Sequence, residues 1–246
     1  MLRVDKKGIY TSSLFPAYPG LVHGYTQRVH GDMRDTVTRN AFFSGIELPN
    51  SDVVWPDQVH GTHVARIVNY PRENRIECDA LVALLQGVEF GSRTLAIHVA
   101  DCVPLLFFDA HSGVIAAAHA GWRGTFGGIS GNVIDEMCFF GSRPENIFVS
   151  LGPHIGACCY SVPEERAERF RKKSNESVRT AVTGEIYLDL ARANVHDLLM
   201  RGVRREHIDA HPTCTACQVD TFYSYRKDEK KMFGEIVGFI GLQRTS

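Results

Sequence analysis

The feature of this sequence that most constrains its fold is a pair of apolar segments joined by a very short connection. Residues 105–109 and 114–118 are extended, apolar stretches separated only by Ala-His-Ser-Gly. A connection this short that ends in Ser and Gly is typical of a tight turn between antiparallel strands. The pair therefore predicts a β-hairpin, and with it a sheet that is mixed or antiparallel rather than doubly wound and parallel.

Further extended segments alternate with helical patterns along the chain. Strands are predicted at 21–26, 64–68, 80–84, 95–99 and 236–242, and helices at 36–45, 124–140, 163–173 and 188–201. Gly141 and Gly202 follow two of these helices at the position expected just past a C-cap. No segment has the composition of a linker and no repeat is evident. We therefore predict an α/β (α+β) fold, with mixed sheet layers flanked by helices, in a single domain spanning 1–246.

Charge and composition narrow the class of partner. The 27 Lys and Arg residues balance 28 Asp and Glu residues, and the isoelectric point is near 6.8. This balance favours a small-molecule partner over nucleic acid or an anionic membrane. The N-terminal segment lacks the apolar stretch of a signal peptide, no apolar run reaches the length of a membrane span, and the 7 cysteines are odd in number and unevenly spread. We expect a cytoplasmic protein with reduced thiols, either a monomer or a homodimer.

Potential metal ligands lie where predicted strands start or stop, in the segments DQVHGT (57–62), ADC (100–102) and AHAGWRG (118–124). His60, Cys102 and His119 offer two imidazoles and one thiolate. Zinc accepts such a set at three tetrahedral corners and leaves the fourth for water or substrate, which is the arrangement of catalytic sites. The alternative is that His119 caps a strand end and Cys102 is a small buried apolar residue. Spacing alone leaves both open.

The whole chain resembles the YfiH family, once called multicopper polyphenol oxidase or laccase-domain proteins. The resemblance is carried, in order, by HGYTQR (23–28), QVHGT (58–62), CDALV (78–82), ADCVPLLFFD (100–109), GVIAAAHAGWRGT (113–125), LGPHIGACCYSV (151–162), LDLARAN (188–194) and CTACQVDTFYSYRKD (214–228). HAGWRGT preceded at the right distance by ADC is highly specific to the family.

The resemblance implies a fold, a metal and an activity. The implied fold has α/β/β/α-like layers, similar to the catalytic domain of the cytotoxic necrotizing factor toxins, whose active site pairs a Cys with a His. The implied cofactor is zinc, with copper as an older attribution, on His60, Cys102 and His119, of which Cys102 and His119 are also the implied catalytic pair. The implied activity is that of a purine nucleoside phosphorylase acting on adenosine, inosine, guanosine and methylthioadenosine, with accompanying adenosine deamination. Editing of peptidoglycan precursors and copper-dependent phenol oxidation are the alternatives.

Three arginines are candidates for holding phosphate or substrate. Arg123 precedes a predicted helix whose free N–H groups would add to its attraction for an anion. Arg28 follows HGYTQ, but the family pattern then continues through a Gly-Gly-Val-Ser and Asn-Leu-Gly stretch, whereas here Val29-His30 runs straight into Gly31-Asp32. Arg226 follows the aromatic residues 222–225, which either stack a purine or form a core-packing strand. The family frequently has Glu where this chain has Ser161.

The remaining candidates are weaker. Asp101 could orient His119 or carry a proton, but neighbours on a strand point to opposite faces. For His98 we favour a packed or solvated histidine. For the adjacent Cys158 and Cys159 we favour buried packing, because adjacent cysteines chelate one ion poorly. For Cys214 and Cys217, packing, a redox pair and a metal site all stay open.

Overall fold

Two mixed β-sheets form the centre of the protein. The computed structural model describes residues 2–48, 50–68, 76–85, 94–211, 213–228 and 233–243. In the first sheet the strand order is Leu2–Val4 (β1), Tyr10–Ser12 (β2), Leu21–Tyr25 (β3), Ile236–Leu242 (β16), Thr94–Val99 (β9) and Val53–Val54 (β4). In the second it is Ile208–Ala210 (β15), Phe148–Leu151 (β12), Val103–Asp109 (β10), Val114–Ala120 (β11), Ala80–Leu84 (β8) and Val64–Ile67 (β6). Shorter pairs are formed by Val178–Thr180 (β13) with Ile186–Leu188 (β14), and by Pro56–Asp57 (β5) with Ile76–Glu77 (β7).

The predicted hairpin is confirmed as β10 and β11. These strands pair antiparallel from Val103 opposite Ala120 to Asp109 opposite Val114. The Asp109 carboxylate closes the turn by accepting hydrogen bonds from the Ser112 hydroxyl at 2.7 Å and the His111 N–H at 2.9 Å. The second sheet also contains the parallel pairs β12–β15 and β6–β8, so the prediction of a mixed sheet is confirmed as well.

The α-helices are Thr36–Gly45 (α1), Trp122–Gly127 (α2), Ile129–Phe139 (α3), Glu164–Lys173 (α4) and Leu190–Met200 (α5), and short 3₁₀ turns lie at Arg28–His30, Asn50–Asp52, Pro144–Asn146, Asn175–Ser177 and Arg205–His207. Aspartates begin α1 and α5, where Asp35 and Asp189 accept hydrogen bonds from the third residue of each helix. Such caps satisfy N–H groups that have no partner within the helix.

The prediction of one helix over 124–140 is wrong, because the chain forms two helices there. Gly128 ends α2 and precedes α3 in the left-handed region, with φ 85° and ψ 34°. Glycine adopts this conformation without steric cost, so the Gly127–Gly128 pair allows a break that the apolar periodicity does not reveal. The break separates the short helix α2, which begins with Trp122 and Arg123, from the longer helix α3.

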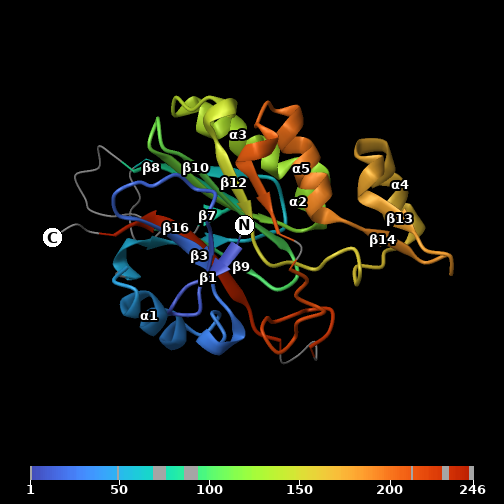
Figure 1. Cartoon of the computed structure of the whole chain (residues 1–246), viewed down its shortest axis with the longest axis horizontal. Helices are drawn as coiled ribbons and strands as arrows, with labels where there is room; N and C mark the ends of the chain where they lie inside the picture. Colours follow the sequence, from blue (N-terminus) through green and yellow to red (C-terminus); the bar gives the residue numbers. More distant parts are fainter. Residues whose placement is uncertain are drawn as a thin grey trace.

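The layers run helix, sheet, sheet, helix (Figure 1). α1 packs on the outer face of the first sheet with residues of β9 and β16, whereas α3 and α5 pack on the outer face of the second. Strand β10 shows how the core is divided: Leu105 and Phe107 point to the helices, and Leu106 and Phe108 point to the first sheet. Both faces of β10 are buried, which explains its continuous apolar sequence. The α/β fold and its implied layering are confirmed.

Across the described ranges, no helix combines the length and the apolar character needed to cross a membrane.

Candidate metal centre and substrate pocket

Ligand atoms of His60, Cys102 and His119 lie within 4.8 Å of one another. His60 comes from the loop between β5 and β6, Cys102 from the turn between β9 and β10, and His119 from the end of β11. The rings of the two histidines meet edge to face, with centroids 4.8 Å apart. The structure thus brings the three predicted ligands together from three segments that are distant in the sequence.

Two of these segments hold non-glycine residues in the left-handed region. His60 has φ 59° and Asp101, next to Cys102, has φ 80°. The conformation is unfavourable for residues with a Cβ and persists where surrounding contacts impose it. At Asp101 those contacts are hydrogen bonds that its carboxylate accepts from the Thr215 hydroxyl at 2.6 Å and the Arg226 N–H at 2.7 Å. This turn is the kink that lets Cys102 leave the regular strand direction.

A glycine leaves room for the three ligands. A Cβ on Gly121 would lie 3.1 Å from the Cys102 sulfur and 3.5 Å from both the His60 and the His119 rings. The backbone of Gly121 is extended, with φ −70°, so its conformation would suit any residue. What this position requires is empty space between the ligands rather than backbone freedom.

Asp79 holds two of the three ligand residues in position through hydrogen bonds. Its fully buried carboxylate accepts hydrogen bonds from the N–H groups of His60 at 2.9 Å and Gly61 at 2.6 Å, and bonds to His119 Nδ1 at 2.9 Å. A carboxylate on Nδ1 fixes the imidazole so that Nε2 is the nitrogen free for a metal. Sequence analysis missed this role, although Asp79 lies in the CDALV segment immediately before a buried strand.

The charges of the site shift its pKa values in opposite directions. Burial lowers the pKa of His119, but the charge of Cys102 and the hydrogen bond with Asp79 outweigh it and raise the pKa to about 10. Burial, followed by the charge of His119, lowers the pKa of His60. The pKa of Asp79 is lowered because hydrogen bonds from His119 and Gly61 outweigh the effect of burial.

The residues fit a metal ion. Two imidazoles and a thiolate supply three ligands, Asp79 orients one of them, and Gly121 keeps the space between them clear. Carboxylate–histidine pairs of this kind are usual behind metal-binding histidines. His60 and Cys102 also line an open cavity, as a catalytic metal requires.

The cavity has a volume of about 410 Å³, within the range of small-molecule sites. Its walls combine metal ligands, aromatic rings and guanidinium groups, contributed by His60, Ala100, Asp101, Cys102, Trp122, Arg123, Ile155, Tyr160, Arg166, Leu190, Tyr225 and Arg226. The guanidinium of Arg166 lies 4.2 Å above the Trp122 ring and donates to the Tyr160 hydroxyl at 3.2 Å. Arg166 and Tyr160 are pocket residues that sequence analysis missed; only the CCYSV segment could have drawn attention to Tyr160.

The three predicted arginines have different surroundings. Arg123 and Arg226 both line the cavity. Arg226 donates to the Ser161 hydroxyl at 3.2 Å. Arg28 instead donates to the carboxylate of Asp228 at 2.7 Å and to the carbonyl of Phe222 at 3.1 Å. Its charge is compensated by that ion pair, and it is not one of the cavity-lining residues.

Several secondary expectations are also settled. Residues 222–225 form turns and loop rather than a strand, and Tyr225 lies exposed at the cavity. Asp101 does not orient His119; Asp79 does. His98 is packed, as expected, with its ring stacked 4.5 Å from that of Trp55.

The favoured interpretation of Cys158 and Cys159 is wrong. Cys158 is exposed, and Cys159 is only half-buried and packs against the edge of the core, so the pair is not buried. Their sulfurs instead lie close to those of Cys214 and Cys217.

Comparison with known proteins bears on this site. The family described as multi-copper polyphenol oxidoreductase laccase matches residues 21–243. The chain belongs to this family. Laccase-domain relatives include the adenosine deaminase RL5 of an unknown prokaryotic organism, 35% identical over 74% of this chain and 72% of that protein. Two further relatives are the purine nucleoside phosphorylases YlmD of Geobacillus stearothermophilus (34% identical; 86% of this chain, 80% of that one) and YfiH of Escherichia coli (34%; 86% and 83%).

Solved laccase-domain structures share the fold. YlmD from Geobacillus stearothermophilus superimposes with a TM-score of 0.86 at 29% identity, covering 99% of both chains. The Bacillus licheniformis protein YfiH gives a TM-score of 0.84 at 25% identity and covers 98% of both. The resemblance noted in the sequence is therefore confirmed at the level of family and fold.

Proposed function

We propose that this protein is a zinc-dependent purine nucleoside phosphorylase that also deaminates adenosine. Its partners are then a purine nucleoside and inorganic phosphate. One relative named as an adenosine deaminase, at 35% identity, and two named as purine nucleoside phosphorylases, at 34%, support the proposal.

The observation that carries it is the position of the His60–Cys102–His119 centre at a cavity that also contains guanidinium groups and aromatic rings. Guanidinium groups recognise phosphate oxygens, and aromatic faces stack on bases. A cavity that offers both beside an open metal site is suited to a nucleoside and an anion together.

A zinc ion held by these three residues would supply Lewis-acid polarisation and a nucleophilic water near neutral pH. The chain's own residues do the positioning. Asp79 holds His119 with Nε2 facing Cys102, and the buried hydrogen bonds at Asp79 fix the loop that carries His60. These contacts hold the histidine ligands in place before substrate binds, and such preorganisation is how electrostatic stabilisation lowers a barrier.

We assign the substrate groups by their chemistry. In phosphorolysis a phosphate oxygen attacks ribose C1′, the bond from C1′ to purine N9 breaks, and the base leaves with a proton. Arg123 is the exposed cation nearest in sequence to the ligand His119, so we place the phosphate against it, with Arg226 as its second contact. Guanidinium groups lie over the rings of Trp122 and Tyr160, so we place the purine against Tyr225, whose exposed ring lines the cavity.

The test incubates zinc-replete protein with adenosine, with and without phosphate, and separates the products chromatographically. We expect adenine and ribose 1-phosphate only with phosphate, and inosine in both cases. His119→Ala should abolish all products while the circular dichroism spectrum stays native. Arg123→Ala should raise the KM for phosphate about tenfold or more, the loss expected for one charge-assisted contact, and leave deamination largely intact.

Other outcomes would overturn the proposal. Absence of every purine product from zinc-replete protein contradicts it and favours the editing of peptidoglycan precursors. Oxidation of a phenol by copper-loaded protein, without purine turnover, would favour the older attribution. The three-ligand centre argues against that result, because laccase chemistry needs several copper ions.

A further inference from the structure

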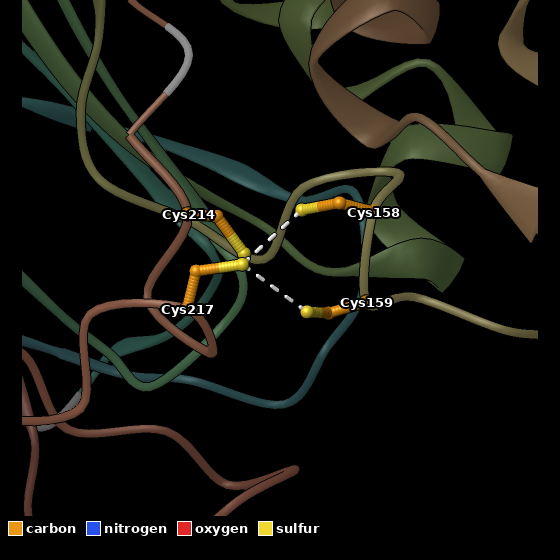
Figure 2. Close-up of side chains that lie close together, drawn as sticks. All are labelled: Cys158, Cys159, Cys214 and Cys217. Atoms are coloured by element: carbon orange, nitrogen blue, oxygen red, sulfur yellow. Dashed lines mark hydrogen bonds between the residues drawn. The ribbon is translucent and has the colours of Figure 1, made fainter.

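Four cysteines gather where two loops meet. Cys158 and Cys159 lie in the loop that follows β12, and Cys214 and Cys217 lie in the loop that follows β15 (Figure 2). Their four sulfur atoms are all within 4.8 Å of one another, and each thiol is free. We call these four residues the thiol cluster.

We propose that the thiol cluster binds a second zinc ion through four thiolates. With Zn–S bonds of about 2.3 Å, the sulfurs of a tetrahedral site lie about 3.8 Å apart. The Cys217 sulfur is 3.5 Å from that of Cys158 and 3.4 Å from that of Cys159. The cluster is therefore already near the required size, and the side chains need only small adjustments. On binding, each ligating thiol releases its proton to solvent.

The local backbone explains how adjacent cysteines can share one ion. Residues 157–159 form a turn in which the Cys159 N–H donates to the Gly156 carbonyl at 3.0 Å, so the alternation of a strand does not apply. The Gly156 N–H also donates to the Cys214 sulfur at 3.2 Å, a contact that favours the thiolate. A Cβ on Gly156 would lie 3.2 Å from the Cys158 sulfur, so glycine allows the close approach.

A disulfide is the alternative role for these cysteines, but it would engage only two of the four sulfurs. It would join Cys217 to only one of two neighbours that lie at nearly equal distances, and it would require an oxidant. A tetrahedral ion engages all four sulfurs without any change in oxidation state. Cys158 and Cys217 are both exposed, so an ion can enter from solvent.

The thiol cluster lies beside two loops that line the cavity, so a second ion would have a structural role there. Cys159 directly precedes Tyr160 and Ser161, and the loop of Cys217 continues to Arg226, whose guanidinium donates to the Ser161 hydroxyl at 3.2 Å. Tyr160 and Arg226 both line the cavity, and the guanidinium of Arg226 lies 5.2 Å above the Tyr160 ring. A zinc ion would tie their two loops together and hold this wall in place. The proposal rests on these contacts and is independent of the proposed activity.

Metal analysis tests the stoichiometry. Protein purified under reducing conditions with zinc present should hold about two zinc ions per chain. Cys217→Ser and Cys158→Ser should each hold one fewer, whereas Cys138→Ser, a half-buried cysteine outside the cluster, should hold as many as the native chain. Equal zinc content in native and Cys217→Ser protein would overturn the proposal.

Two further measurements do not depend on the folding of a cysteine variant. X-ray absorption of the zinc in His119→Ala should show four sulfur neighbours at about 2.3 Å, since only the thiol cluster then remains intact. In native zinc-replete protein, Cys158 and Cys217 should resist alkylation until a chelator is added. Nitrogen or oxygen neighbours in the first measurement, rapid alkylation in the second, or a Cys159–Cys217 disulfide in the reduced preparation would each contradict a tetrathiolate site.

Discussion

Gly121 lies against all three ligand side chains of the metal centre. Its missing side chain separates one sulfur and two imidazole rings. Nothing in the backbone demands glycine there, so the requirement arises entirely from the ligands around it. A single methyl group at this position therefore tests the metal geometry without disturbing the fold.

Gly121→Ala should weaken zinc binding about tenfold or more, the scale of effect seen when the surroundings of metal ligands are altered. The reason is that the new Cβ would push Cys102, 3.1 Å away, out of the shared position. Chelator competition measures the affinity. Gly45→Ala is the matched control, since no heavy atom lies within 4 Å of its Cβ, and it should leave zinc affinity unchanged. Unchanged affinity in Gly121→Ala would contradict the assigned centre.

The raised pKa of His119 predicts how stability depends on pH when the metal is removed. The native state retains the proton up to pH about 10, whereas the unfolded state loses it near pH 6.5. The native state therefore binds more protons in this window, and the free energy of unfolding should fall as pH rises from about 6.5 to about 10. Urea unfolding in the presence of a chelator measures the slope. His119→Gln should flatten it, and an equal slope in both proteins would exclude His119 as the source.

At the scale of elements, the break between α2 and α3 sets the position of Trp122 and Arg123 in the first turn of α2. Gly128 lies between the helices with φ 85°, and its Cβ position is 3.5 Å from the Lys173 ammonium. That ammonium in turn donates to the carbonyls of Thr125 and Phe126, both at 3.0 Å. The end of α2 is thus fixed by a glycine and by a cation at its carbonyls.

Gly128→Ala should destabilise the protein by about 1–2 kcal/mol, because a residue with a Cβ is strained in the left-handed region. Chemical denaturation measures the loss. Gly141→Ala is the control: with φ 95° it is also strained, but no heavy atom lies near its Cβ and it is outside the cavity wall. Both variants should lose stability, and only Gly128→Ala should also lower kcat/KM. Equal activity in the two would show that the break does not position Arg123.

At the scale of the whole molecule, the cavity is lined by loops and helix ends that the two sheets bring together. Asp101, in the turn between β9 and β10, joins the first sheet to the second and binds the loop that precedes β16. Its buried carboxylate accepts hydrogen bonds from the Thr215 hydroxyl and from the backbone N–H of Arg226. This one side chain therefore couples the turn of Cys102 to the loop of Arg226.

Asp101→Asn should raise the KM for substrate while zinc content stays the same. The amide oxygen can still accept from the Arg226 N–H, and the amide nitrogen can donate to the Thr215 hydroxyl. The negative charge that strengthens both hydrogen bonds is lost, at a cost of about 1 kcal/mol. Steady-state kinetics with parallel metal analysis makes the comparison. Thr215→Ser, which keeps a hydroxyl there, should behave as the native chain. Loss of zinc in Asp101→Asn would instead assign this residue to the metal centre.

The sequence by itself determined the elements and the chemistry of the ligands. The apolar runs of β10 and β11 with their four-residue turn, and the periodicities of α1 and α5, are local signals, so they could be recognised without a structure. His60, Cys102 and His119 were selected by their residue types and by the family resemblance. The helix break at Gly128 was missed because apolar periodicity continues across it.

Tertiary structure alone decided which of these residues meet. Asp79 supports His119, Arg28 pairs with Asp228, and the thiol cluster forms across the 54 residues that lie between Cys159 and Cys214. None of these contacts has a fixed spacing along the chain, because each joins segments near the ends of strands whose order in the sheets differs from their order in the sequence. Residue types set what chemistry is available, and the packing of the two sheets determines which of these side chains come together in one site.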